Sequence, residues 1–491
     1  MKSNYIKLIC CAIAIFGLSS CSDDFLDKKP TEFVDYDAAT KTTENLMTTL
    51  NGIHRSLYIR YESSQGQCGL GALMQQTDIA GDDVVFPVTN GWFLAVYNWS
   101  SLTNENGADV RFPYRTYYRI IRNANTIINA ADVAIGAQED KNIVKGQALL
   151  YRAFCHFQLV QLYGKRYVNG ETNSQLGVPV VLTVGSDNLP RATVEEVYAQ
   201  INKDLDEANV LLEDYDKPNN SHLDLKVAQG LKARVALTQG NWQIAADYAK
   251  KAKSGMSLMS AAEYSSGFND YNNKEWMWGS HINEVQTDYF GNFGAFMSRN
   301  YNSTVIRSCP KAINSKLYNM ISSTDVRASL FSKDGQHPGL SLPSNFAKFP
   351  YTSQKFLSVS TGDSRCDVPY MRAAEMYLIE AEAKAKLNQS DAAKILFELE
   401  KTRNPNYVLS TNTGQALIDE ILIRRRIELW GEGFRFFDLK RTNSPLDRTG
   451  ANHDTSITNG VLSVPATDKR WQWLIPRAEI DANPLVKQNE L

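Results

Sequence analysis

The chain has few cysteines for its length, and their spacing does not suit a disulfide framework or a zinc site. Seven occur in 491 residues; three lie near the start, and the other four are Cys68, Cys155, Cys309 and Cys366. No C-x-x-C pair is present, which argues against both kinds of site. A basic excess is also lacking, since 52 Lys and Arg residues face 54 Asp and Glu residues. We therefore expect no nucleic-acid partner.

The motifs of common enzymes are missing as well. The six histidines form no H-E-x-x-H pair, and neither a G-x-S-x-G elbow nor a P-loop occurs. Gly69 and Gly71 lack the third glycine of a dinucleotide-binding loop. These absences predict no catalytic residue, no metal site and no cofactor, although a structural calcium ion is left open.

One enzymatic alternative stays open, because a glycosidase needs only two carboxylates roughly 5 to 10 Å apart. Asp78, Asp82 and Asp83 in "TDIAGDD" are the candidates. Aspartates in such a loop more commonly make turn-forming hydrogen bonds. We therefore favour a structural or ligand-contacting role for this segment over catalysis.

A long hydrophobic run is absent too. The apolar stretch from Leu8 to Leu18 is well short of the roughly 20 residues that a membrane-spanning helix needs. It follows a basic start and precedes "LSSC", as in a secretory signal, and Leu18 to Cys21 resembles the lipobox of bacterial lipoproteins. The resemblance implies that residues 1–20 are a signal peptide and that Cys21 carries a covalent lipid such as palmitate. An ordinary signal peptide cut nearby is the alternative.

The expected anchor leads into an acidic segment. "SDD" directly after Cys21 resembles the surface-export signal of some Gram-negative lipoproteins. We therefore expect residues 21–36 to be a lipidated tether and the body, residues 37–491, to be a single domain on the outer membrane, facing the cell exterior. A flexible solvated tether is compatible with the same charges.

Helical patterns are the dominant secondary-structure signal in the sequence, mainly in residues 37–62, 112–255 and 370–440. Thr193 and Glu196 form a capping box ahead of an apolar residue at each helical turn. "LKARVALTQGNWQIAADYAKKAK" and "YLIEAEAKAKLNQSDAAKILFELEKTR" each predict a helix, a turn and an alanine-rich helix, typical of tetratricopeptide-like hairpins. Unrelated helical hairpins are the alternative. We predict a mainly α fold with a few short strands.

Two segments lack this periodicity, residues 65–110 and 264–367. Both are rich in glycine, asparagine, serine and aromatic residues. Long irregular stretches inside a compact domain are commonly functional loops. We therefore expect the ligand-binding part of the molecule there.

Several motifs together resemble the SusD/RagB family over nearly the whole chain. They are the lipobox with "CSDDFLDKKP", "ALLYRAFCHFQLVQLYG", "GVPVVL", "LPRATVEEVYAQINKDLDEA", "YMRAAEMYLIEAEA", "RRRIELWGEGFRFFDLKR" and "WQWLIPRAEIDANPLVKQN". The resemblance implies four tetratricopeptide-like hairpins with a variable loop-rich part. It also implies a non-enzymatic surface lipoprotein that captures oligosaccharides for a SusC-like TonB-dependent transporter. A RagB-like branch of the family handles peptides, so peptide capture is the main alternative.

Aromatic residues in the irregular segments are the candidate ligand contacts. A pyranose ring presents C–H faces and a polar rim, so it suits a flat aromatic group beside Asn, Asp or Arg side chains. The candidates are Asp82, Trp92, Asn98, Trp99, Tyr289, Phe293, Arg299 and Tyr301, with Asp288, Phe290 and Asn292 in the same loops. Burial in the core is the alternative for each. A purely structural repeat protein is a further alternative, against which these loops argue.

The segment "RRRIELWGEGFRFFDLKR" admits two interpretations. Its arginines, Arg424, Arg425, Arg426 and Arg435, suit a clamp for an anionic ligand. Alternatively, Glu428, Arg435 and Asp438 pair with one another while Leu429, Trp430 and Phe434 pack in the core. We favour the structural interpretation.

Overall fold

The computed structural model describes residues 36–60, 64–89, 91–185 and 188–491. The predictions for the signal peptide 1–20, for Cys21 and for the tether up to residue 35 lie outside these residues. Helices make up most of the regular structure, and the strands are few and short. The prediction of a mainly α fold is confirmed.

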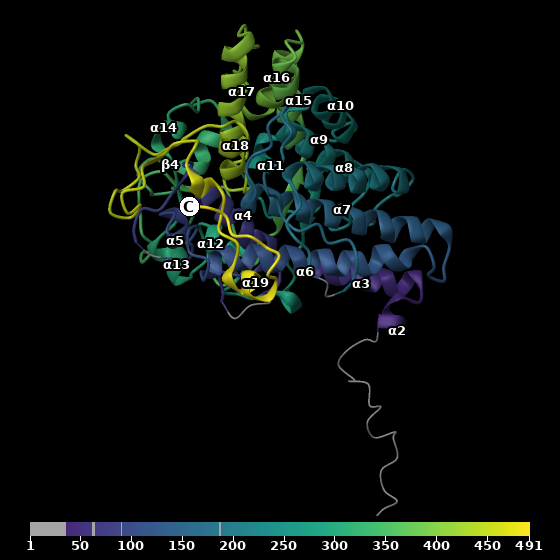
Figure 1. The fold of residues 1–491 in the computed structure, drawn as a ribbon. Helices are drawn as coiled ribbons and strands as arrows, with labels where there is room; N and C mark the ends of the chain where they lie inside the picture. The colour runs from purple at the N-terminus through teal and green to yellow at the C-terminus, as the bar shows by residue number, and fades with distance from the viewer. Residues whose placement is uncertain (1–35, 61–63, 90, 186–187) are drawn as a thin grey trace, which may run out of the picture.

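A stack of long helices forms one side of the molecule. Figure 1 shows α3, α6, α7, α8, α9 and α10 lying one above another, with α15, α16 and α17 continuing the stack. Their bounds are α2 Tyr36–Thr40, α3 Thr43–Ser56, α6 Ala108–Ala131, α7 Gln138–Tyr163, α8 Val194–Leu211, α9 Leu225–Gln239, α10 Trp242–Ala252, α15 Ala373–Lys386, α16 Ala392–Arg403 and α17 Gly414–Glu428. The predicted capping box of Thr193 and Glu196 begins α8.

Short helices and loops cover the other side. They are α4 Gly69–Ile79, α5 Leu94–Tyr97, α11 Ala261–Tyr264, η2 Glu284–Gln286, α12 Phe293–Met297, α13 Thr304–Ser308, α14 Ser315–Tyr318, η3 Val326–Leu330, α18 Arg435–Arg441, η4 Lys469–Trp471 and α19 Arg477–Ala482. Every residue of α4 is buried. The segment 65–110, expected to be loop-rich, therefore contains an internal helix of the core.

The strands tie distant parts of this side together. A four-stranded antiparallel sheet has the order β1 Val84–Val85, β3 Ala312–Ile313, β5 Thr352–Ser353 and β4 Phe331–Ser332. β2 Trp276–Ser280 pairs antiparallel with β6 Val368–Arg372 across a bulge, and β7 Leu446–Asp447 pairs with β8 Ser463–Val464. The two predicted irregular segments are thus joined by β1 and β3.

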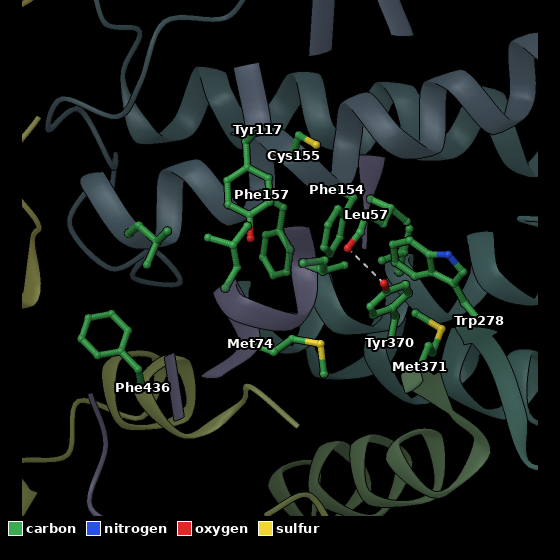
Figure 2. Close-up of a cluster of buried hydrophobic side chains, with 14 of the residues drawn as sticks. Leu57, Met74, Tyr117, Phe154, Cys155, Phe157, Trp278, Tyr370, Met371 and Phe436 are labelled. Carbon is green, nitrogen blue, oxygen red and sulfur yellow. Dashed lines mark hydrogen bonds between the residues drawn. The ribbon is translucent and has the colours of Figure 1, made fainter. Parts of the chain in front are cut away.

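The core lies between the two sides. Figure 2 shows Phe154 and Phe157 of α7 facing Met74 of α4. Tyr370 of β6 lies in the same cluster, and its hydroxyl donates to the Leu57 carbonyl at 3.3 Å. Aromatic and sulfur-containing side chains fill irregular spaces well. They fix the loop-rich side against the helical stack.

A buried network of ion pairs joins the end of α17 to β6 and α16. The Glu428 carboxylate accepts from Arg372 at 3.1 Å, from Arg403 at 3.0 Å and from Arg327 at 3.1 Å. Burial opposes ionisation, but the three guanidinium groups outweigh it and hold the pKa of Glu428 well below its usual range. Breaking a buried, fully bonded pair leaves an uncompensated charge. This network therefore fixes the position of the segment that follows Glu428.

Candidate functional site

The acidic "TDIAGDD" segment and the arginine-rich segment bind each other. Arg435 Nε lies 2.5 Å from Asp82 Oδ1, and Arg426 Nη2 lies 2.6 Å from Asp83 Oδ1. The Arg435 backbone N–H donates to Asp78 Oδ1 at 3.0 Å. Burial opposes ionisation of Asp82, yet Arg435 outweighs it and lowers the pKa of Asp82 to about 2. These carboxylates are therefore buried and bonded to the arginine-rich segment, which corrects the expectation that Asp82 contacts a ligand.

The structural interpretation of the arginine-rich segment agrees with this geometry, but the predicted partners were wrong. Asp438 accepts from Arg425 at 2.8 Å and from Arg441 at 2.7 Å, while Glu428 binds the arginines described above. Phe434 is only partly buried and lies between two guanidinium groups, Arg234 and Arg425, each 5.1 Å from its ring centroid.

Three other candidate ligand residues lie in the core. Trp99 is 1% exposed, and its indole N–H donates to the Ala80 carbonyl at 2.8 Å. Phe293 is 2% exposed and packs edge-on against Phe356. Arg299 is fully buried, and its Nη2 donates to the Ala347 carbonyl. None of the three presents a surface to a ligand in this conformation, because neighbouring elements cover them.

Asn98 and Tyr301 take intermediate positions. Asn98 Oδ1 accepts from the backbone N–H of Ser100 at 3.1 Å and from its hydroxyl at 2.6 Å, which closes the turn after α5. Tyr301 is 5% exposed. Burial raises the pKa of Tyr301, and the nearby charge of Asp363 adds to this effect. Asn98 therefore has a local structural role, whereas Tyr301 lies at the border of the surface described next.

Loops from four parts of the chain meet beyond the C-terminal end of α3. The surface that they form, called the loop cluster below, consists of Tyr58, Arg60, Asp288, Tyr289, Phe290, Tyr301, Asp363 and Arg365. The Tyr58 hydroxyl donates to Gln286 Oε1, which joins the end of α3 to η2. This contact brings residues 228 positions apart in the sequence onto one face.

Polar contacts fix the shape of the loop cluster. Arg60 Nη2 lies 3.0 Å from Asp288 Oδ2. The Asn292 side-chain amide donates to the Asp288 carbonyl at 2.8 Å and to Ser364 Oγ at 2.7 Å. Asn292 Oδ1 in turn accepts from the Ala295 N–H and caps α12. The loop around Tyr289 is thus held from both sides before any ligand binds.

A second ion pair completes the surface. The Arg365 side chain donates to Asp363 Oδ2 at 2.7 Å through Nε. This bond raises the pKa of Arg365, with smaller contributions from Glu284 and Tyr289. The bond from the Asn292 amide to Ser364 Oγ at 2.7 Å places the 357–366 loop beside the 284–292 loop.

Exposed apolar groups lie directly beside these ion pairs. Phe290 is 59% exposed and Val285 is 95% exposed, while Tyr289 is partly exposed. Trp92 is partly buried, with its ring edge-on to Phe296. The Trp92 ring covers Gly66, where a Cβ atom would lie 3.0 Å from it. Because the Gln65 carbonyl also approaches Gly291, the turn around Gly66 connects Trp92 to the loop that carries Tyr289.

The structure therefore brings together Trp92, Tyr289 and, at the border, Tyr301. Sequence reasoning missed Tyr58, Arg60, Asp363 and Arg365. Tyr58 and Arg60 follow a helix whose sequence predicts only a structural role. Asp363 and Arg365 lie in a segment without periodicity. No local pattern marks these residues, because their role depends on contacts with loops far away in the sequence.

Two classes of site have no support within the described ranges. There, no three His, Cys, Asp or Glu side chains are grouped so that they could hold a metal ion. In the same part of the chain, no helix has the length and apolar character needed to span a bilayer. The four cysteines from Cys68 onward are buried free thiols.

Two family models match complementary parts of the chain. The model described as the SusD family matches residues 246–491, half of the chain, and a model described as starch-binding associating with outer membrane matches residues 24–237. SusD-like protein P2 of Formosa agariphila is 28% identical over 251 residues. That match spans 51% of this chain and 46% of the relative, about half of its length.

Solved structures share the fold over nearly the whole chain. A SusD-like carbohydrate-binding protein from Bacteroides vulgatus is 26% identical with a TM-score of 0.82, covering 92% of this chain and 99% of that one. A SusD superfamily protein from Bacteroides thetaiotaomicron has a TM-score of 0.78 at 24% identity, covering 92% and 100%. A laminarin-binding SusD-like protein has a TM-score of 0.69 at 19% identity, covering 91% and 99%. The chain belongs to the SusD/RagB family, a family of non-catalytic binding proteins.

Proposed function

We propose that this protein is a cell-surface lipoprotein that binds oligosaccharides at the loop cluster and delivers them to a SusC-like TonB-dependent transporter in the outer membrane. The observation that carries the proposal is the pair of the partly exposed Tyr289 and the exposed Phe290, two aromatic groups beside fixed polar side chains. The carbohydrate-binding solved relative from Bacteroides vulgatus supports the same ligand class.

The chemistry of a sugar ring matches this surface. The flat face of Phe290 can cover the C–H face of a pyranose. The carboxylate of Asp288 and the guanidinium groups of Arg60 and Arg365 can bond to hydroxyl groups at its rim. Since both arginines already have a carboxylate partner, binding a neutral sugar leaves no charge unpaired. A neutral glycan is therefore the first ligand to test.

Truncation of the exposed aromatic groups tests the proposal. We expect Phe290→Ala and Tyr289→Ala each to weaken glycan binding by about 1 to 3 kcal/mol without lowering the melting temperature. Binding is measured by isothermal titration of the full-length chain in detergent, with a panel of neutral oligosaccharides.

Tyr36→Ala is the matched control, because Tyr36 is 47% exposed and lies on α2, outside the loop cluster. Its affinity for the glycan should equal that of the unchanged protein. Equal affinity for all three variants would refute the loop cluster as the binding site.

Peptide capture by the same surface is the alternative within the fold, and a peptide panel in the same titration separates it from glycan binding. Binding of peptides with no binding of any glycan would favour the RagB-like function. An extracellular glycosidase is less compatible with the structure, because Asp82 and Asp83 are paired with arginines. New reducing ends after incubation with the glycan would revive that alternative.

The anchor and the transporter belong to the same proposal. A lipid at Cys21 would hold the body at the outer leaflet, where a transporter beside it gains from a high effective concentration. Co-purification of the tagged full-length chain from membranes tests the partnership. We expect a TonB-dependent transporter in stoichiometric amount, and its absence would contradict that part of the proposal.

A further inference from the structure

A hollow lies where the ends of three elements meet, and it shares no residue with the loop cluster. Its volume is about 430 Å³, within the range of small-ligand pockets. Leu439 and Trp471 form an apolar floor, and Asn443 and Ser444 contribute polar groups. It is called the α18 pocket below.

A single buried lysine fixes the walls of the α18 pocket. Lys440 Nζ donates to the carbonyls of Gln161 at 2.5 Å, Gly164 at 2.7 Å and Trp471 at 2.7 Å. The first two carbonyls belong to the end of α7 and the third to η4, so one ammonium group on α18 holds both neighbouring walls. A pocket that is already shaped loses little free energy to ordering when a ligand binds.

The α18 pocket carries an excess of positive charge. Lys165, Arg166 and Lys469 line it, against a single carboxylate, Asp468. Lys440 lies beside them, but burial lowers its pKa to about 7, so it adds less charge. That carboxylate accepts from Arg470 Nη2 at 2.9 Å, so it does not neutralise the lining cations.

Two of the lining cations have no carboxylate partner within the described ranges. Lys165 and Arg166 have no ion-pair partner among the described residues. Lys469 differs, because its Nζ lies 3.7 Å from Glu490 Oε2 and donates to the Leu491 backbone oxygen at 3.0 Å. Cations gathered in a hollow with apolar walls attract anions strongly. This is notable in a chain with a formal charge of −2.

We propose that the α18 pocket binds an anionic sugar unit, one that carries a carboxylate or a sulfate ester. Lys165 and Arg166 at the entrance pair with the anionic group. The amide of Asn443 and the hydroxyl of Ser444 bond to ring hydroxyls, and the apolar floor accepts a C–H face. This site is independent of the loop cluster and does not rest on the function proposed for it.

A charge reversal at the entrance tests the site. The probe is tetragalacturonate, titrated into the full-length chain in detergent, with maltotetraose as the neutral comparison. We expect Lys165→Glu with Arg166→Glu to raise the Kd for tetragalacturonate at least tenfold. The affinity should also fall with added sodium chloride, because exposed charges are screened.

The matched control reverses two exposed lysines on α10, Lys250→Glu with Lys251→Glu, and we expect it to change the Kd by less than twofold. An equal loss in both double variants would overturn the proposal, because it would reflect net charge alone. Unchanged affinity in the entrance variant, or no binding of tetragalacturonate at millimolar concentration, would overturn it as well.

Two further measurements separate the α18 pocket from other sources of anion binding. Phe290→Ala should leave tetragalacturonate binding unchanged. If this variant no longer bound tetragalacturonate, the ligand would lie on the loop cluster and the inference would be overturned. Vesicles of phosphatidylglycerol should not compete with tetragalacturonate. Displacement by these vesicles that requires Lys165 and Arg166 would assign the pocket to a lipid headgroup and would also overturn it.

Discussion

At the scale of single residues, several buried cations bind backbone carbonyls instead of carboxylates. Arg448 is fully buried, and its guanidinium group donates to the Gly81 carbonyl at 2.6 Å, to Tyr97 at 2.6 Å and to Ile79 at 3.2 Å. Its carbon Cζ also lies 4.5 Å from the centroid of the Tyr97 ring. One side chain late in the sequence therefore bonds to carbonyls at the C-terminal ends of α4 and α5.

Arg448→Met should destabilise the protein on the order of 3 kcal/mol, because it leaves several buried carbonyls without a donor. Urea denaturation followed by circular dichroism measures the change. Arg477→Met is the control, since Arg477 is 52% exposed in an i,i+4 pair with Asp481. We expect less than about 0.5 kcal/mol from this variant. Equal losses in the two variants would contradict the assigned role of Arg448.

Asp78 makes stability depend on pH. Burial raises the pKa of Asp78 to about 7, although the N–H of Arg435 opposes this, and Asp78 Oδ2 has no hydrogen-bond partner. Between pH 4 and pH 7 the unfolded chain releases this proton while the folded chain keeps it, so the group costs more stability as the pH rises. The free energy of unfolding of Asp78→Asn, relative to that of the unchanged protein, should therefore increase by roughly 2 kcal/mol from pH 5 to pH 8.

Denaturation curves of both proteins at several pH values provide this measurement. The quantity to compare is the difference in stability between the two proteins at each pH. Buried histidines such as His156, whose pKa burial lowers to about 3, change the stability of both proteins in the opposite direction below about pH 6.5. Asp214→Asn, at an exposed position, is the control. A constant offset for Asp78→Asn would exclude the raised pKa.

At the scale of elements, the contact between α4 and the α17–α18 segment holds the loop-rich side together. α4 is wholly buried, and the acids that follow it meet Arg426 and Arg435. The carbonyl of Gly433, just before α18, also accepts from the Thr77 hydroxyl at 2.9 Å. Elements more than 340 residues apart in sequence thus share one set of bonds.

Arg435→Ala should lower stability by about 3 to 5 kcal/mol, because Asp82 would remain buried without its partner, although Asp83 keeps Arg426. Thermal melting measures the loss. The double variant Arg435→Met with Asp82→Leu should recover part of it, since both charges are then removed. Normal melting of Arg435→Ala combined with lost glycan binding would show instead that this segment is a ligand clamp.

At the scale of the whole molecule, α3 separates α2 from the loop cluster. α2, where the described chain begins, lies next to the start of α3 (Figure 1), and Tyr58 and Arg60 follow its end. Fourteen residues of helix span about 21 Å. The segment between Cys21 and Tyr36 reaches at most about 50 Å. Because this reach exceeds the length of α3, an anchor at Cys21 would allow the loop cluster to turn in more than one direction.

Cys21→Ala should move the protein from the membrane fraction to the soluble fraction and abolish labelling by palmitate, because the thiol is the only acceptor for the lipid in the proposed lipobox. Cell fractionation and labelling measure both effects. Ser22→Ala keeps the thiol and is the control. Labelling that persists in Cys21→Ala would refute the anchor.

Local patterns were sufficient for the helical stack but not for the site. The capping box at Thr193 predicted the start of α8 because its bonds are made within four residues. Trp92 and Trp99 stand seven positions apart in equally irregular sequence, yet only Trp99 is in the core. Trp99 has a φ of 61° and Phe93 a φ of 72°, on either side of α5. Such left-handed conformations are uncommon outside glycine, and no residue pattern here indicates them.

The sequence by itself determined the helical periodicity, the lack of metal and enzyme motifs, and the family, because these depend on residue type and short spacing. Tertiary structure alone decided that Asp82 is bound by Arg435, that Phe290 is exposed and that Lys440 holds the α18 pocket. The physical reason is that burial and ion pairing depend on which distant segments meet. On the loop-rich side, these contacts join residues that lie hundreds of positions apart in the sequence.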